Sequence, residues 1–429
     1  MNKIRSITIK GFRGQKSPIV LNLQDDANFL IGRNGTGKTT LINLIHDVLS
    51  LNTSGLREAK FDSVEITFKA LRGRKHPRIL VESTIGELGR ELSYVVQESL
   101  GGEKNRFEVT RPIRRRVKLS NGNDVVTTTS SSPSLKMLRD LLSNIFKTSW
   151  LSLQRRSETI EVDSDPFDDD DRGSDVDQKL DQVFNDLLRY FSRLDRSVAD
   201  QTTQFQQRWF LSFLSSNQTH SFDPFGKLDL AHERNALEAI FANFALPPGT
   251  YRSRLDEHFS LAAKAKEDLA NRRAGIPMDS VSTMFDSLRL HTLVDEWQTL
   301  QEAKSKIYLP RTSFIETASS MLFRKNVEIN TSNQLILRTD SGDIIPQRSL
   351  SSGEKQLLIF LGETLLQENK PYIFLADEPE LSLHVEWQEE LVPNLLKINP
   401  NAQVLFATHS PDIVNSYQRN VTRMEEITD

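Results

Sequence analysis

Two adjacent carboxylates, Asp377 and Glu378, end a short apolar run and could act on a metal ion and a water molecule. The run Ile373–Ala376 precedes them and Pro379 follows, which predicts a buried strand that ends in a turn. Ligands of open α/β sheets bind at the carboxyl ends of strands. The pattern is typical of a Walker B motif, so we predict that Asp377 holds Mg²⁺ through its water shell and that Glu378 polarises an attacking water. A strand that ends in a solvated acidic turn is the alternative.

A glycine-rich loop could bind phosphate groups next to these acids. The predicted strand Phe29–Ile31 runs into GRNGTGKTT, from Gly32 to Thr40, which matches the pattern GxxxxGK[ST]. Glycines let backbone N–H groups surround phosphate oxygens, and the N-terminus of the following helix favours the same anion. We expect Lys38 to reach the β- and γ-phosphates and Thr39 to offer its hydroxyl to Mg²⁺. The candidate nucleotide-binding residues of the loop are Gly32, Asn34, Gly35, Thr36, Gly37, Lys38, Thr39 and Thr40. A glycine-rich turn without a nucleotide is the alternative.

Two further segments stand in an order that suits the same site. Leu350–Glu354, LSSGE, precedes a predicted apolar helix, and a serine and a glycine at a helix N-terminus can bind an anion, although they also suit a simple turn and cap. The predicted strand Val404–Ala407 ends in THSP, which places His409 at the carboxyl edge of the same sheet. We therefore predict that His409 senses the γ-phosphate.

The elements between these motifs fall into three kinds. Short β-type runs between about Asp62 and Leu119 predict an antiparallel sheet beside the nucleotide fold. The turn-rich string Asn121–Pro133 is interpreted as a linker. Apolar residues at helical spacing from Leu180 to about Leu309 predict an amphipathic helical subdomain, and Phe314–Phe323 predicts one more helix.

Several polar stretches allow two interpretations each. Two basic clusters, one around Arg72–Arg78 and one around Arg111–Lys118, could contact DNA or RNA phosphates or an acidic partner, or could be solvated hairpin loops. The acid-rich stretch 163–177 could bind Ca²⁺ or mimic nucleic acid, but without EF-hand spacing a solvated or disordered loop suits it better. Gln154 could reach Mg²⁺ and the γ-phosphate, or could be a structural residue at a strand end.

Composition excludes several classes of protein. The chain has 429 residues, a net charge of −4 and no cysteine, so disulfides, cysteine-ligated zinc and a thiol nucleophile are excluded. A pI near 6.1 confines any contact with nucleic acid to a local patch. We see no signal peptide and no apolar run of the ~20 residues that span a bilayer, so we expect a cytoplasmic protein without a membrane contact.

Taken together, GRNGTGKT, LSSGE, YIFLADEPE, ELSLH and ATHSP resemble the ATPase heads of the ABC class, above all the SMC-like and overcoming-lysogenisation-defect (OLD)-type ATPases. The motifs cover about residues 1–60 and 340–415. The resemblance implies an α/β fold: a P-loop NTPase of ABC type with a mixed central sheet flanked by helices, an antiparallel β subdomain and an α-helical insertion. We expect the ATPase domain to comprise residues 1–140 and 325–429, with the insertion at 141–324.

The same resemblance implies a composite site that binds ATP and Mg²⁺. Lys38, Thr39, Asp377, Glu378 and His409 would act on one subunit, while Ser351 and Gly353 would close over the same γ-phosphate from a second subunit. ATP would then hold a dimer together, and hydrolysis would release it. Arg13, in the GFRG stretch, resembles a nucleotide-contacting arginine of SMC-like heads, although an exposed arginine at a strand end is equally compatible. The chain departs from transporter heads at Glu354 and at His384, where an aspartate is usual, so the contribution of that loop to catalysis is open.

For the biological role, the resemblance leaves a transporter ATPase, a DNA-repair ATPase and an OLD-like defence ATPase. The long middle segment disfavours a transporter, and the absence of a cysteine hook disfavours a long-armed repair ATPase. OLD-type enzymes commonly continue into a TOPRIM nuclease, whereas only 19 residues follow Ser410 here. We therefore expect a separate effector chain of nuclease type and a phage-encoded trigger, as in PARIS-type (AriA-like) anti-phage systems, with the Septu type as a near alternative. An SMC-like ATPase that acts directly on DNA is the alternative function.

Overall fold

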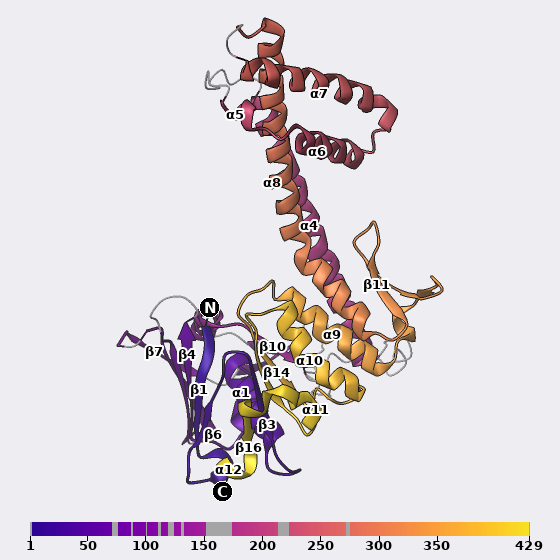
Figure 1. Ribbon diagram of the computed structural model, residues 1–429. Helices are drawn as coiled ribbons and strands as arrows, with labels where there is room; N and C mark the ends of the chain where they lie inside the picture. Colours follow the sequence, from indigo (N-terminus) through magenta and orange to yellow (C-terminus); the bar gives the residue numbers. More distant parts are fainter. Residues whose placement is uncertain are drawn as a thin grey trace. The chain divides into compact units, whose positions relative to one another are not determined.

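The computed structural model describes residues 2–70, 76–86, 89–99, 101–109, 113–118, 124–129, 133–151, 174–212, 223–271 and 275–428 (Figure 1). It divides into two compact units. The first comprises Met1–Arg189 and Arg311–Asp429, and the second comprises Tyr190–Pro310. The predicted insertion, 141–324, is therefore wider than the second unit, because helix α3 (Pro133–Ile145), strand β10 (Thr148–Leu151) and the start of helix α4 (Asp175–Ser212) belong to the first.

A five-stranded parallel sheet forms the centre of the first unit. Its order is β10, β14 (Ile373–Asp377), β15 (Gln403–Ala407), β3 (Ala27–Ile31) and β16 (Val421–Arg423). All four pairings in it are parallel. Strands β3, β14 and β15 are almost continuously buried, which suits short apolar runs covered on both faces. The carboxyl ends of β3, β14 and β15 therefore lie at one edge, where the three predicted motifs begin.

A six-stranded antiparallel sheet stands beside the parallel one. Its order is β2 (Ile19–Asn22), β1 (Asn2–Lys10), β4 (Ser63–Ala70), β5 (Arg78–Gly86), β6 (Gly89–Gln97) and β7 (Lys104–Val109). Helix α1 (Lys38–Ser50) lies between the sheets, and one apolar core joins residues of both sheets to this helix (Figure 1). The predicted α/β fold class is confirmed. The parallel and antiparallel strands lie in two separate sheets rather than in one mixed sheet.

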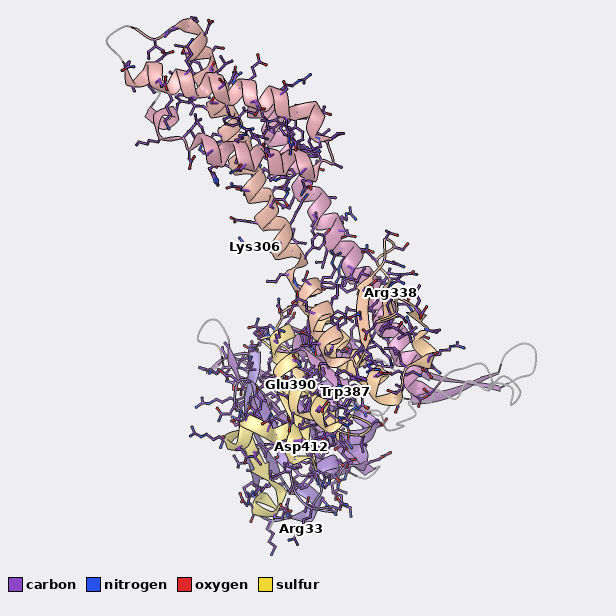
Figure 2. The ribbon with its side chains drawn as sticks, turned by 45° about the vertical axis from the view of Figure 1, so that its right-hand side comes forward. Arg33, Lys306, Arg338, Trp387, Glu390 and Asp412 are labelled. Atoms are coloured by element: carbon purple, nitrogen blue, oxygen red, sulfur yellow. The ribbon has the colours of Figure 1, made fainter. Side chains whose placement is uncertain are left out.

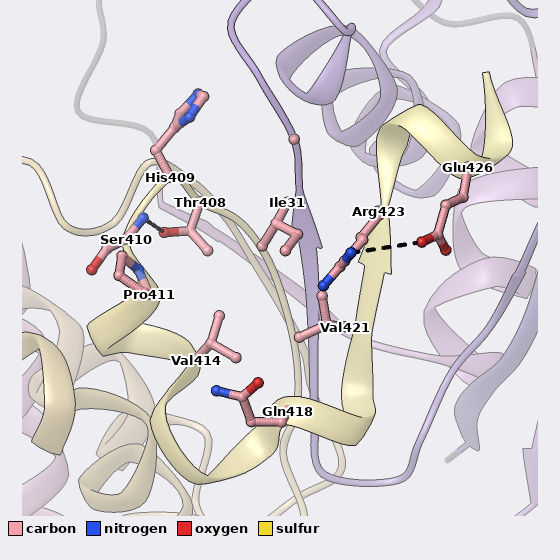
Figure 3. Close-up of a pocket in the computed structure, with 11 residues that line it drawn as sticks. Ile31, Thr408, His409, Ser410, Pro411, Val414, Gln418, Val421, Arg423 and Glu426 are labelled. Carbon is pink, nitrogen blue, oxygen red and sulfur yellow. Dashed lines mark hydrogen bonds and ion pairs between the residues drawn. The ribbon is translucent and has the colours of Figure 1, made fainter. Parts of the chain in front are cut away.

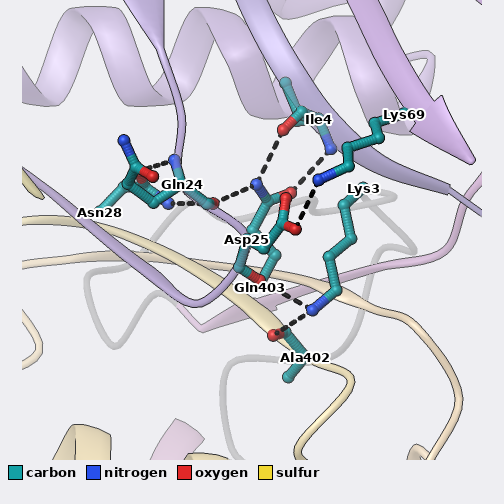
Figure 4. A network of polar contacts seen from close by, with 8 residues as sticks. All are labelled: Lys3, Ile4, Gln24, Asp25, Asn28, Lys69, Ala402 and Gln403. Carbon is teal, nitrogen blue, oxygen red and sulfur yellow. Dashed lines mark hydrogen bonds and ion pairs between the residues drawn. The ribbon is translucent and has the colours of Figure 1, made fainter. Parts of the chain in front are cut away.

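A buried glutamine joins the two sheets where β1 is irregular (Figure 4). The register of β1 against β4 shifts between Ile4 and Ser6, which marks a bulge. Gln403, fully buried at the start of β15, accepts a hydrogen bond from Ile4 N at 2.7 Å and donates to Ile4 O at 2.8 Å. Its Nε2 also donates to Gln24 O at 2.7 Å. The side-chain amide thus binds the backbone of a strand 399 residues away in the sequence.

The interpretation of Asn121–Pro133 as a linker was wrong in part. Residues Asp124–Thr129 form strand β9, which pairs with β8 (Ile113–Lys118) in a two-stranded antiparallel sheet. The run Val125–Thr129 is entirely β-branched, and such residues favour strands over the turn signalled by their neighbours. Helix α2 (Thr53–Glu58) follows α1, and the strands β11 (Lys325–Ile329), β12 (Leu335–Thr339) and β13 (Ile344–Ile345) form a third antiparallel sheet.

Helices from the C-terminal part complete the first unit. They are α9 (Ser352–Leu366), α10 (Val385–Ile398), α11 (Pro411–Val414) and α12 (Met424–Ile427). Aromatic rings of α9, β14 and β15 pack together, since the Phe360 and Phe374 centroids are 6.4 Å apart and those of Phe374 and Phe406 are 5.9 Å apart. This packing fixes α9, which carries the LSSGE segment at its start, against the central sheet.

The second unit is helical, as predicted. It contains parts of α4 and of α8 (Met278–Met321), with α5 (Asp223–Lys227), α6 (Leu230–Asn243) and α7 (Pro248–Ala270) between them in the sequence. Helices α4 and α8 run antiparallel, because Asp195 accepts a hydrogen bond from Tyr308 at 2.8 Å and Arg208 pairs with Glu296 at 3.3 Å. The predicted separate helix Phe314–Phe323 is instead mostly the end of α8, which continues through Pro310.

No helix in the described part of the chain has both the length and the apolar character needed to cross a membrane.

Candidate active site

The loop Gly32–Gly37 connects β3 to α1. Gly35 and Gly37 have φ of +85° and +96°, a region that side chains with a Cβ rarely adopt. No described side chain caps the N-terminus of α1 at Gly37, so the first N–H groups of that helix keep no side-chain partner. A helix N-terminus without a side-chain cap favours an anion. The loop therefore has the local geometry of a phosphate-binding site.

Lys38 lies folded over this loop. Its Nζ donates to Gly32 O at 2.7 Å and to Arg33 O at 3.3 Å, and the residue is 5% exposed. Burial lowers the pKa of Lys38, while the carboxylates of Glu378 and Asp377 act in the opposite direction. These two carbonyl bonds hold the ammonium group in place near Asp377 and Glu378, at the end of β14.

Asp377 and Thr39 offer oxygen atoms of the kind that Mg²⁺ binds. Burial raises the pKa of the Asp377 carboxyl, and the nearby Thr39 hydroxyl acts in the opposite direction. Asp377 Oδ1 is buried and has no hydrogen-bond partner among the described residues. No group of three metal-ligating acids or histidines occurs in the described ranges. Because Mg²⁺ commonly takes one or two protein oxygens and completes its shell with water and substrate phosphates, this pair fits the ion.

Glu378 and His409 approach each other from the ends of β14 and β15. Glu378 adopts a left-handed backbone with φ of +50°, and its N–H donates to Ala407 O at 2.8 Å. His409 Nε2 lies 3.9 Å from Glu378 Oε1, beyond hydrogen-bonding distance. A non-glycine residue in this conformation is uncommon and often accompanies a functional constraint. The two side chains thus flank a small space at the carboxyl edge of the sheet.

Arg13 completes the same region from the N-terminal segment. It has φ of +52°, and its Nη1 donates to Gly35 O at 3.2 Å. A cavity of about 350 Å³ is lined by Arg13, Asn34, Gly35, Gly37, Lys38, Thr39, Thr40, Glu378 and His409. The structure therefore brings together most of the candidate residues predicted from three separate motifs.

Ser351 and Gly353 do not belong to this lining as far as the described residues show. Ser351 caps α9: its hydroxyl accepts from Glu354 N at 3.3 Å, and Glu354 Oε2 accepts from Ser351 N at 2.9 Å. A Cβ at Gly353 would lie 2.3 Å from Ser382 O, so only glycine allows this approach. Gln154, the basic cluster at 72–75 and most of the acid-rich stretch 163–177 lie outside the described residues.

A second cavity of about 350 Å³ shares His409 with the first (Figure 3). The side chains of Thr408, Ser410, Gln418, Arg423 and Glu426 contribute to it. Arg423 and Glu426 lie 4.0 Å apart, and Ser410 N donates to Thr408 Oγ1 at 2.9 Å. The C-terminal segment with β16 and α12 thus forms one side of this cavity.

Two acids that the sequence analysis did not single out contact the loops of the site. Glu380 Oε1 accepts from His409 N at 2.7 Å and from Ser410 N at 3.2 Å. Glu425 Oε1 accepts from Arg33 N at 2.7 Å, while the Arg33 side chain projects outward (Figure 2). Glu380 is the third acid of the DEPE string, which was the only available signal, and no local pattern distinguished Glu425.

Comparison with known proteins shows the family. The model of a family described as "AAA domain, putative AbiEii toxin, Type IV TA system" matches residues 27–415. This match covers most of the chain, which therefore belongs to that family of AAA-type ATPases. The resemblance to ATPase heads inferred from the motifs is confirmed at this level.

Two relatives carry similar names. The chain is 36% identical over 78 residues to the "Retron Ec83 probable ATPase" of Escherichia coli. This match covers 16% of this chain and 14% of the relative. It is 20% identical over 454 residues to the "Retron Vc95 probable ATPase" of Vibrio cholerae serotype O1 biovar El Tor, which covers 96% of this chain and 71% of the relative.

Solved Smc head domains are similar over nearly the whole chain, but weakly. The head of Pyrococcus furiosus Smc with an extended coiled coil, bound to the C-terminal domain of ScpA, has a TM-score of 0.40 and 10% identity, covering 99% of this chain and 93% of that one. The Thermotoga maritima head has a TM-score of 0.36 and 13% identity, covering 96% and 91%. At this level the similarity adds nothing to the argument above.

Proposed function

We propose that the chain binds Mg-ATP at the cavity lined by Arg13, the Gly32–Thr40 loop, Glu378 and His409, and hydrolyses it. The observation that carries the proposal is the convergence of these residues on one cavity of about 350 Å³. A loop for phosphate, an acid for water and a histidine opposite that acid are the parts that phosphoryl transfer to water requires.

Each residue has a role that follows from its position. Amides of the loop and the α1 N-terminus bind the phosphates, and Lys38 exchanges its two carbonyl partners for phosphate oxygens. Thr39 and Asp377 would hold Mg²⁺, which would neutralise phosphate charge when bound. Glu378 accepts a proton from the attacking water as the bond between the γ-phosphorus and the bridging oxygen breaks, and His409 donates to the γ-phosphate. The products are ADP and phosphate.

A second copy of the chain would complete the site. Ser351 and Gly353 stand at the α9 N-terminus, apart from the described cavity lining, so they meet a nucleotide only if another subunit presents one. Leu381 and Val385 beside them are 43% and 51% exposed, which suits a surface that is covered on dimerisation. We infer that ATP bridges two subunits and that hydrolysis separates them.

The family description and the names of the relatives support a biological role. The description names a toxin and a type IV toxin–antitoxin system, and both relatives are named as retron ATPases. We propose that ATP binding and hydrolysis by this chain control a separate effector in anti-phage defence. A nuclease effector, a phage-encoded trigger and the PARIS-type assignment are finer predictions that rest on the motif resemblance alone.

The test compares phosphate release and ATP binding in three proteins. Wild-type protein should hydrolyse ATP slowly, Glu378→Gln should bind ATP with turnover reduced about 100-fold or more, and Lys38→Ala should lose ATP binding. Wild-type turnover in Glu378→Gln would contradict the assigned base, and tight ATP binding by Lys38→Ala would contradict the loop as the phosphate site. Purification of tagged Glu378→Gln with Mg-ATP from cells that express its neighbouring genes then identifies the partner. Nucleic acid without a protein partner would favour direct action on DNA.

A further inference from the structure

The turn after Asp377 and Glu378 contacts the loop that carries His409. Its residue Glu380 directs one carboxylate oxygen, Oε1, to two consecutive amides: His409 N at 2.7 Å and Ser410 N at 3.2 Å. A carboxylate that accepts two N–H groups forms charge-assisted bonds, which are stronger than neutral ones. The contact joins residues 29 and 30 positions apart, on the turns that follow two adjacent strands.

The turn that carries Glu380 is itself held from the opposite side. Gln356, buried in α9, donates from Nε2 to Pro379 O at 3.0 Å. Leu383 N donates to Glu380 O at 3.0 Å, which closes the turn. The approach of Gly353 to Ser382 O leaves no room for a methyl group between α9 and this turn. Glu380 therefore projects from a fixed platform, so its carboxylate can hold another loop in place.

The loop around His409 has separate supports on each side of the histidine. Thr408 N donates to Leu30 O at 3.0 Å, and Ser410 Oγ donates to Gln388 Oε1 at 2.6 Å. The backbone of His409 itself is held through its N–H by Glu380. Because the His409 ring stands 3.9 Å from Glu378, a small backbone shift here would alter the space between base and histidine.

We propose that Glu380 is a positioning residue that fixes His409 opposite Glu378 by binding the backbone N–H groups of His409 and Ser410. The inference rests on the proposed ATPase function. Glu380 is absent from the cavity lining in the described structure, so it acts through His409. Its second oxygen, Oε2, is buried without a hydrogen-bond partner among the described residues, so the bonds through Oε1 are the contacts that hold the carboxylate.

The experiment combines steady-state ATPase kinetics with hydrogen exchange of the peptide that contains His409 and Ser410. Glu380→Ala should lower kcat about 100-fold with the KM for ATP unchanged, because a displacement of about 1 Å in a catalytic group has that effect. Glu380→Gln keeps an acceptor oxygen, so we expect it to recover about tenfold of the loss and to keep the peptide protected. Glu390→Ala, an exposed acid on α10, is the matched control (Figure 2).

Two comparisons separate positioning from general stability. In a His409→Ala background, Glu380→Ala should reduce kcat by less than about threefold, because the two residues act as one unit. Exchange of the His409–Ser410 peptide should rise in Glu380→Ala and stay unchanged in Glu390→Ala. Unchanged exchange in both Glu380 variants would show that Glu380 does not hold the His409 and Ser410 amides, whatever the ATPase result. Two results would overturn the positioning role. One is raised exchange in Glu380→Ala together with a wild-type kcat. The other is the same fold loss of kcat from Glu380→Ala in the His409→Ala background as in the wild-type background. A wild-type chain without ATP hydrolysis would overturn the proposed function. The exchange data would still show whether Glu380 holds the His409 and Ser410 amides.

Discussion

Replacing Gln403 by leucine should loosen the junction between the two sheets that enclose α1. The substitution removes the amide that pairs with Ile4 N and Ile4 O. Each buried backbone group left without a partner costs about 1–3 kcal/mol, so the two together cost about 4 kcal/mol. Gln24 O loses one bond but keeps the donation from Asn28 Nδ2 at 3.0 Å, so it adds little. A buried leucine returns about 2 kcal/mol, which leaves a net loss of about 2 kcal/mol.

Urea unfolding at pH 7 measures this loss as a change in the free energy of unfolding. Gln207→Leu, the same substitution at an exposed position of α4, is the control and should stay within about 0.5 kcal/mol of wild type. Stability of Gln403→Leu within that same range would refute the reasoning. It would mean that Ile4 finds other partners and that the sheets are joined by their apolar core alone.

Three further predictions concern the loops of the site. Ser351→Arg and Ser351→Ala both remove the α9 cap, so each should lose about 1 kcal/mol of stability. Only the arginine variant should block ATP-dependent dimerisation, measured by light scattering. Dimers of Ser351→Arg would contradict a site shared between subunits. Burial opposes the ionisation of Glu354, yet Lys325 at 2.5 Å and the Ser351 amide hold its pKa below the ordinary value. Its stabilisation should therefore be complete above about pH 4.3 and lost as pH falls through the lower folded pKa. Glu354→Gln should therefore cost about 2 kcal/mol at pH 7 and progressively less as the pH of urea unfolding falls below about 4.3. Glu425→Ala frees the Arg33 amide and should weaken ATP binding in calorimetry, whereas unchanged affinity would show that the loop needs no support from the C-terminal segment.

Local patterns predicted the parts of the site that depend on neighbours in the chain. The strand, the glycine-rich loop and the helix from Phe29 to Leu49 are contiguous, and glycines occupy the positions with positive φ at Gly35 and Gly37. Apolar runs that end in Asp377 and Ala407 likewise predicted two buried strands. Parallel strands align their carboxyl ends, so the motifs that follow these strands were expected at one edge of the sheet.

Local patterns were misleading where two signals competed. Asn121 and Gly122 suggested a linker, but the β-branched run that follows pairs as β9 with a preceding strand. The sequence also predicted two helices separated near Pro310, whereas the structure has one helix, α8, that continues through that proline. For β9, the neighbouring strand β8 supplied the pairing that the string of residue types did not reveal.

The sequence by itself determined which chemistry is present: a phosphate loop, two acids and a histidine, each at the end of a short apolar strand. Only the tertiary structure decided how those groups are held. Gln403 binds Ile4 across 399 residues, Glu425 binds the Arg33 amide across 392, and Glu380 binds His409 across 29. These bonds join side chains to backbone amides, and a backbone amide carries no mark of residue type. The partners therefore become visible only when folding brings the two segments together.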